Sequence, residues 1–152
     1  MRTVFEVANW FLHKEPMSHK KVQKLCYYTQ AWNYALKRAP FIDTNFEAWV
    51  HGPVSRQLYE KYAGSGFCDL FPDSAVPSSD FTSEEREHLE SVWVTYGEHT
   101  GNSLEALTHS EPPWINARAG CGDDERCEKC IEPEDMTTYY RSIYIGDLET
   151  EA

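Results

Sequence analysis

The cysteines of the segment CGDDERCEKC (121–130) are the residues whose spacing points most directly to chemistry. Cys127 and Cys130 are separated by two residues, as in one half of a zinc knuckle, and Cys121 adds a third thiolate. A structural zinc site usually combines two such half-sites, and this sequence has one. The pattern therefore leaves two interpretations: a zinc site that takes Cys68 or a histidine as its fourth ligand, or a reduced loop without metal.

Three histidines raise a second kind of chemistry, acid–base or nucleophilic catalysis. His19, His51 and His109 are each expected at or near a helix end, and Cys26 is a candidate nucleophile. The sequence has no HExxH motif, no glycine-rich phosphate loop and no nucleophile elbow. We therefore predict that the protein is not an enzyme, that it has no catalytic residue, and that zinc is its one candidate cofactor.

The stretch SHKKVQK (18–24) gathers three lysines at the start of a predicted helix, in a chain of net charge −11. Lysines are locally unfavourable there, because the first N–H groups of a helix already carry partial positive charge. Either they pair with acidic neighbours, or they form a contact patch for an acidic or phosphate-bearing partner. Tyrosine is a favoured interface anchor. The predicted partner-binding residues are Lys20, Lys21, Lys24 and Tyr28.

The elements that position these residues follow from hydrophobic periodicity and from caps. The strongest pattern covers 18–38, which predicts a central helix with Ser18 as its N-cap. The run FEAWV (46–50) predicts a short strand, and Thr82 with Glu85 forms a capping box. Further helices are predicted at 2–14, from Pro53 to Gly64, from Thr82 to Gly97 or Gly101, from 102 or 103 through Leu107, from Pro112 to Ala117, and from Pro133 onwards.

Length and composition set the broad class. With 152 residues, of which 41% are hydrophobic, the chain is predicted to be mainly α, a compact helical domain of about six to seven helices with a small β element. We place a single domain at 1–146 and an acidic, flexible tail at 147–152. No run of about 18 apolar residues and no signal-peptide pattern appears, so we expect a cytoplasmic protein without a membrane partner. The acidic balance makes nucleic acid an unlikely ligand.

Four segments resemble the motifs of the Panacea domain, a family that includes SocA-like and GepA-like phage-associated proteins. They are KVQKLCYYTQAW (21–32), FEAWVHGPVSRQLYEKY (46–62), LTHSEPPWINAR (107–118) and EDMTTYY (134–140), in the family's order and at comparable spacing. The resemblance covers nearly the whole chain, apart from the cysteine loop and the acidic tail. The family pattern falls on Lys24, Leu25, Tyr27, Tyr28, Gln30, Trp32, Trp49, Gly52, Pro53, Val54, Leu58, Tyr59, His109, Glu111, Pro113, Trp114 and Arg118.

The resemblance implies a mainly helical antitoxin that neutralises a cognate toxin protein by direct protein–protein interaction. The alternative that it implies is a proteolytic adaptor, which delivers a toxin or another client to an ATP-dependent protease. Most of the motif residues are expected to define the fold, and the motif assigns no toxin contacts. Lys24 is expected to hold a buried or half-buried pairing, which leaves Lys20 and Lys21 free to face a partner.

Overall fold

The structure, a computed structural model, describes residues 1–77 and 80–151, with side chains as far as Tyr144. Within those ranges it has seven helices and four short strands, which confirms the predicted mainly α fold. In chain order the elements are α1 (Val4–Lys14), β1 (Met17–Ser18), α2 (His19–Lys37), β2 (Glu47–Trp49), β3 (Gly52–Val54), α3 (Arg56–Tyr62), β4 (Asp69–Leu70), α4 (Ser83–Tyr96), α5 (Gly101–His109), α6 (Pro112–Ala117) and α7 (Pro133–Glu151).

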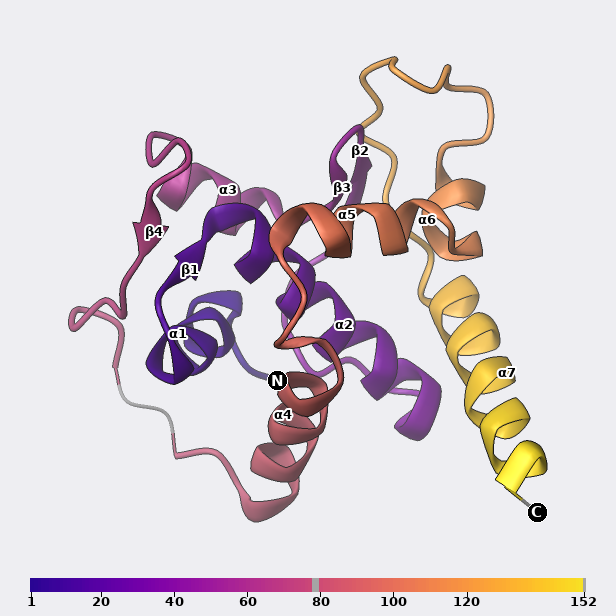
Figure 1. Cartoon of the computed structure of the whole chain (residues 1–152), viewed down its shortest axis with the longest axis horizontal. Coiled ribbons are helices and arrows are strands. Elements are labelled where there is room, and N and C mark those ends of the chain that lie inside the picture. The colour runs from indigo at the N-terminus through magenta and orange to yellow at the C-terminus, as the bar shows by residue number, and fades with distance from the viewer. Residues whose placement is uncertain (78–79, 152) are drawn as a thin grey trace.

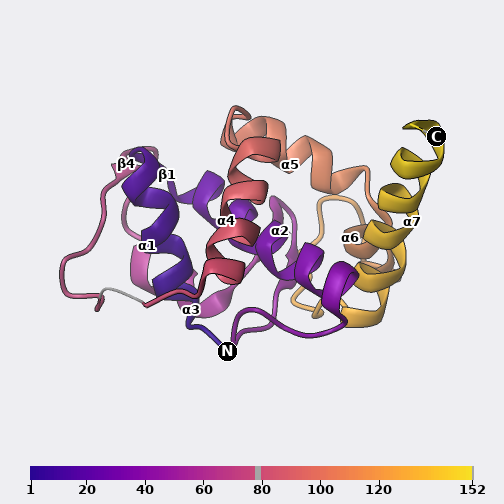
Figure 2. The same ribbon diagram turned by 90° about the horizontal axis from the view of Figure 1, so that it is seen from below.

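Helix α2 is the centre of the molecule, as its periodicity predicts. Helices α1, α4, α5 and α7 all pack against it, and Figures 1 and 2 show it crossing between them. Ser18 is its N-cap, and the Ser18 hydroxyl accepts a hydrogen bond from the backbone N–H of Lys21. Because neighbours surround α2, most of its side chains are buried, including charged ones.

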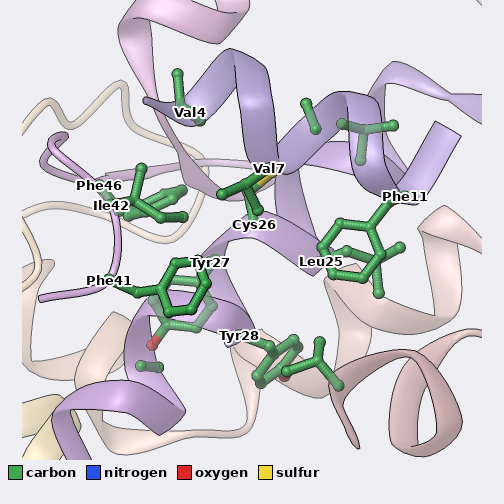
Figure 3. Close-up of a cluster of buried hydrophobic side chains, with 14 of the residues drawn as sticks. Val4, Val7, Phe11, Leu25, Cys26, Tyr27, Tyr28, Phe41, Ile42 and Phe46 are labelled. Atoms are coloured by element: carbon green, nitrogen blue, oxygen red, sulfur yellow. The ribbon is translucent and has the colours of Figure 1, made fainter. Parts of the chain in front are cut away.

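The hydrophobic core surrounds α2, with buried side chains from α1, α4, α5 and α7 packed around it. Figure 3 shows Val7 and Phe11 of α1, Leu25 and Cys26 of α2, and Phe46 of the following loop gathered in one cluster. All five side chains are buried. A core of this kind fixes the position of α2, and α2 in turn positions the polar residues that face its other neighbours.

The capping box that the sequence predicts for α4 is present. The hydroxyl of Thr82 accepts from the N–H of Glu85 at 3.1 Å, and the Glu85 carboxylate accepts from the N–H of Thr82 at 2.8 Å. Arg2 also donates to Glu85, at 2.7 Å and 2.9 Å, so the start of α4 is tied to the N-terminus of the chain.

The helix predicted from Pro53 to Gly64 is wrong at its start. Residues 52–54 form β3, which pairs antiparallel with β2, and helix α3 begins at Arg56 after the N-cap Ser55. Gly52 has a φ of +103°, which is incompatible with a helix, and the Pro53 carbonyl accepts a hydrogen bond from Lys24 of α2. The tertiary contact with α2 therefore overrides the helix-starting preference of proline. The strand predicted at 46–50 is confirmed as β2.

A second pair of strands lies in segments for which the sequence predicts no strand. Strand β1 pairs antiparallel with β4, with Met17 opposite Leu70 and Ser18 opposite Asp69. This pairing holds the 63–72 loop against the start of α2.

Helix α7 continues through most of the segment predicted as a tail. It runs from Pro133 to Glu151 and crosses residue 146 without a break, while residue 152 lies outside the described part. The flexibility of 147–152 and the domain limit at 146 stay predictions. Within the described ranges, no helix has the length and apolar character needed to cross a membrane.

Candidate partner-binding site

The motif residues mostly lie inside the fold, where they join α2 to the β2–β3 hairpin and to α6. The indole N–H of Trp114 donates to the carbonyl of Trp49 at 2.9 Å, and Arg118 donates to the carbonyl of Ala48 at 2.8 Å. Tyr59 is the most exposed motif residue, with 39% of its surface accessible. The half-buried members are Trp32, Trp49, His109 and Trp114, and the buried ones are Lys24, Leu25, Tyr27, Tyr28, Gln30, Gly52, Pro53, Val54, Leu58, Glu111, Pro113 and Arg118.

Glu111 is the centre of a buried polar cluster. The hydroxyls of Tyr28 and Tyr140 both donate to Glu111 Oε1 at 2.8 Å, and the Tyr27 and Tyr140 hydroxyls lie 3.1 Å apart. Burial raises the pKa of the Glu111 carboxyl, and the two tyrosine donors partly offset that shift. Tyr28 also stacks on Tyr96, with ring centroids 3.9 Å apart. We call Tyr27, Tyr28, Glu111 and Tyr140 the tyrosine–glutamate cluster.

Lys24 is a second buried charged group on α2. Its ammonium donates to the Pro53 carbonyl at 3.1 Å. A Cβ atom on Gly52 would lie 2.6 Å from Lys24 Cε, and the φ of +103° at Gly52 also disfavours a residue with a side chain there. Burial lowers the pKa of Lys24 to about 7, with a further lowering by the charge of Lys20 and a partial compensation by Glu105. The pairing expected for Lys24 is therefore with a carbonyl.

The predicted contact patch is not a continuous surface, because three of its four residues are buried. Lys24 and Tyr28 are 1% and 0% exposed, and Lys21 is 8% exposed. Lys21 donates to the carbonyl of Gly97 at 2.6 Å and pairs with Glu15 at 3.3 Å, so the expectation that it faces a partner is wrong. Neighbouring helices cover this side of α2.

Lys20 is the half-exposed member of the predicted patch. Its ammonium lies 2.7 Å from a carboxylate oxygen of Glu105 and donates to the side chain of Asn102 at 3.0 Å. Both partners belong to α5. Pairing with an acidic neighbour, the first of the two sequence interpretations, therefore applies to Lys20 and Lys21.

A pocket of about 370 Å³ opens where the starts of α2 and α5 meet. Gly101 makes this approach possible, since a Cβ atom there would lie 3.1 Å from Ser18 Oγ. The walls include Trp49, Tyr59 and Phe67, and Lys20 and Lys24 also line the space. We call this space the α2–α5 pocket.

Beside the pocket, the 63–72 loop presents two aromatic side chains to solvent. Phe67 is completely exposed, at 102%, and Phe71 is 66% exposed. Leu70, between them, is buried and belongs to β4, which pairs with β1. We call the segment 63–72 the aromatic loop. Exposed phenylalanines on an anchored segment are typical of a protein-binding surface.

The histidines and Cys26 do not assemble a catalytic group. His19 packs against Tyr59 and has a pKa lowered to about 4 by burial and by Lys24, while His51 is exposed and lies 3.3 Å from Glu105. His109 stacks on Trp114 with ring centroids 4.1 Å apart. Cys26 is fully buried, and burial raises the pKa of its thiol, which disfavours the reactive thiolate.

The cysteine loop brings together two of its three candidate metal ligands. The sulfur atoms of Cys121 and Cys127 lie 2.7 Å apart, while Cys130 is exposed. In the ranges 1–77 and 80–144, no group of three or more His, Cys, Asp or Glu side chains is placed to hold a metal ion. Arg118 holds the loop by donating to the carbonyls of Gly122 and Glu125. Zinc binding at Cys121, Cys127 and Cys130 stays a prediction.

Several residues of this region carry no motif and were not singled out by the sequence. Phe67 and Phe71 lie in the Gly- and Ser-containing run GSGFCDLF (64–71), where two phenylalanines in a predicted surface loop are the available signal. Glu105 and Gly101 reach the site only because α5 packs against the start of α2. No spacing rule connects residues that are about 80 positions apart.

The fold and its internal motif place the chain in a known class of protein. The chain belongs to the antitoxin SocA-like family with the Panacea domain, whose family model matches residues 22–115. That range extends from α2 through the aromatic loop and α5 into α6. The family indicates a role in a toxin–antitoxin pair, and it indicates a non-enzymatic role.

A particular relative supports the same assignment. The chain is similar to Antitoxin SocA of Caulobacter vibrioides (strain NA1000 / CB15N), with 26% identity over 147 residues, covering 83% of this chain and 78% of that protein. No solved structure gives a significant match. The resemblance noted from the motifs is confirmed.

Proposed function

We propose that this chain is an antitoxin that neutralises its partner toxin by direct protein–protein binding through the aromatic loop. The main support for this proposal is that Phe67 is fully exposed and Phe71 is 66% exposed in a member of an antitoxin family. Burying a phenylalanine side chain contributes roughly 1.5–3 kcal/mol, and hot-spot residues of this size typically lie at the centre of an interface.

The setting of the loop supports this role. Pairing of β4 with β1 fixes the backbone between the two phenylalanines, and Leu70 and Met17 are buried beneath it. Binding through an ordered segment loses less conformational entropy than binding through a free one. The net charge of −11 also favours fast association with a basic toxin surface.

Co-expression with the product of the adjacent reading frame tests the proposal. The wild-type chain is expected to restore growth and to co-purify with that product. The double variant Phe67→Ser/Phe71→Ser is expected to bind at least tenfold more weakly at a nearly unchanged melting temperature, because Phe67 is fully exposed and Phe71 is mostly exposed. Val94→Ser on α4, which removes another exposed apolar side chain at 78% exposure, is the matched control and should bind normally.

Two outcomes would contradict the proposal. Normal binding by the double variant would remove the aromatic loop from the interface. Rescue of growth without a stable complex, accompanied by faster loss of the partner when an ATP-dependent protease is present, would favour the adaptor mechanism instead.

A further inference from the structure

The α2–α5 pocket concentrates positive charge in an otherwise acidic chain. Helices α2 and α5 both begin at its wall, with Ser18 and Thr100 as their N-caps. The Ser18 hydroxyl accepts from the N–H of Lys21 at 3.2 Å, and the Thr100 hydroxyl accepts from the N–H of Ser103 at 3.0 Å. Helix geometry leaves the preceding N–H groups of each helix without an intrahelical acceptor. Two such helix starts beside each other favour an anion.

Lys24 provides an independent sign of a missing ligand. Its side chain is 1% exposed and lines the pocket; its ammonium has three N–H donors, and within the ranges that the structure describes it donates one hydrogen bond, to the Pro53 carbonyl. Among residues 1–77 and 80–144, no carboxylate lies within ion-pair distance of Lys24. The nearby carboxylate of Glu105 pairs with Lys20 at 2.7 Å and with His51 at 3.3 Å. The negative charge of one carboxylate, Glu105, is therefore shared by a region that holds two lysines and two helix starts.

The rest of the pocket is apolar. Trp49 and Tyr59 contact each other edge to face, with ring centroids 4.8 Å apart, and Val54 and Phe67 continue the wall. A volume of about 370 Å³ is within the range of small-molecule sites, which combine apolar walls with a few convergent polar groups. The aromatic walls favour a planar ring as the body of the ligand.

We propose that the α2–α5 pocket binds a small aryl phosphate, with the phosphate between Lys20, Lys24 and the two helix starts and the ring against Trp49, Tyr59 and Phe67. A phosphate monoester carries a charge of about −1.5 to −2 near pH 7, which balances two ammonium groups more closely than a carboxylate does. Its three terminal oxygens can accept from both lysines and from backbone N–H groups together. The site shares Phe67 with the proposed toxin-binding loop, but recognition of the phosphate by Lys20 and Lys24 does not depend on toxin binding.

Calorimetric titration of the full chain with phenyl phosphate tests the site. Phenyl phosphate is expected to bind one to one, at least tenfold more tightly than inorganic phosphate or benzyl alcohol, because each of these carries only half of the recognised chemistry. Phenylacetate is expected to bind more weakly than phenyl phosphate. No detectable binding of phenyl phosphate would overturn the proposal, and equal binding of phenylacetate would overturn the assignment to a phosphate.

Substitutions locate the site. Lys24→Met and Lys20→Met are each expected to weaken phenyl phosphate binding at least tenfold, whereas Lys37→Met, at the far end of α2 where Lys37 pairs with Glu84, should leave it unchanged. Lys20 is half-exposed, so Lys20→Met should fold. It still tests the site if Lys24→Met fails to fold. Wild-type affinity in Lys20→Met, or an equal loss in Lys37→Met, would contradict this site.

Discussion

Two buried charged groups, Glu111 and Lys24, differ in how the surrounding residues satisfy them. The Glu111 carboxylate accepts from Tyr28 and Tyr140 at 2.8 Å each, inside a buried cluster. The Lys24 ammonium donates to the carbonyl of Pro53, and the Lys24 side chain lines the α2–α5 pocket. The first arrangement is closed and stabilises the fold. The second arrangement leaves N–H donors of Lys24 for a ligand, and it contributes less to the stability of the fold.

The difference explains why one helix carries two kinds of motif residue. Tyr28 faces α6 and α7 through Glu111 and Tyr140, and it holds these elements together. Lys24 faces the hairpin at Gly52, where a residue with a side chain is disfavoured. Burying a charge costs free energy unless hydrogen bonds compensate it; two tyrosine hydroxyls do so for Glu111, whereas Lys24 has the Pro53 carbonyl among the described residues.

Loss of the acceptor in the closed cluster should have the largest effect. Glu111→Ala leaves the hydroxyls of Tyr28 and Tyr140 buried without their acceptor, at roughly 1–3 kcal/mol each, so we expect a loss of about 3 kcal/mol in the free energy of unfolding. Urea denaturation measures it. Glu111→Gln keeps a carbonyl acceptor and removes the charge, so it should cost about 1 kcal/mol or less. Equal losses for the two variants would mean that the charge matters and the cluster geometry does not.

The burial of Lys24 should make the free energy of unfolding depend on pH. Lys24 has a pKa of about 7 in the folded chain and an ordinary value of 10.5 when unfolded, so the unfolded chain binds more protons between these values. Below about pH 7, Lys24 is charged in both states, and the folded chain bears the full free-energy cost of burying that charge. This cost disappears as the pH rises toward 10.5, because Lys24 is then neutral in the folded chain. Relative to Lys24→Met, wild-type stability should therefore rise by about 1.4 kcal/mol per pH unit between pH 7.5 and 9.5.

Denaturation curves of both proteins across this window measure the effect. The titratable groups that face Lys24 are His19 and Lys20 of α2 and Glu105 and His109 of α5, and all four are retained in Lys24→Met, so the difference between the two curves reports mainly on Lys24. Parallel stability curves for the two proteins would show that the Lys24 pKa is ordinary.

Lys21 is a third lysine of α2, and its substitution should have a smaller effect. Lys21 is nearly buried, but it has a carboxylate partner, Glu15, and a carbonyl partner, Gly97, and it lies 5.4 Å from the ring centre of Trp93. Lys21→Glu should lower the free energy of unfolding by about 2 kcal/mol, because it breaks these contacts and places two carboxylates together.

Lys20→Glu is the adjacent control. Lys20 is half-exposed beside Glu105, and its substitution should change stability by about 1 kcal/mol or less. Thermal and urea denaturation of both variants separate the two positions. Equal destabilisation would mean that the difference in burial between Lys20 and Lys21 has no energetic consequence.

The sequence predicts local structure well where local chemistry decides it. The N-cap at Ser18, the capping box at Thr82 and the periodicity of α2 all depend on residues within a few positions of each other. Pro53 shows the limit, because a proline after glycine fits both a helix start and a strand, and the contact with Lys24 decides between them. Lys24 and Pro53 are far apart in the sequence, so local patterns do not predict their contact.

The site was less predictable than the fold for the same reason. Lysine spacing at 20, 21 and 24 indicates a cationic patch, but the residues that bury or pair these side chains come from other helices, such as Glu105 and Gly97. Among the candidate zinc ligands, Cys121 and Cys127 meet, although the two-residue spacing favours Cys127 and Cys130. Spacing along the chain does not determine distance in a loop that Arg118 folds.

The pKa of Lys24, measured by NMR, tests the central contrast most directly. The ¹³Cε shift of Lys24, assigned by comparison with Lys24→Met, would be followed from pH 5 to pH 11 in the free chain. A titration midpoint near pH 7 is the predicted result, because a buried ammonium without a carboxylate partner loses its proton early. A midpoint within about one unit of 10.5 would contradict it, since Lys24 would then be either solvated or fully paired.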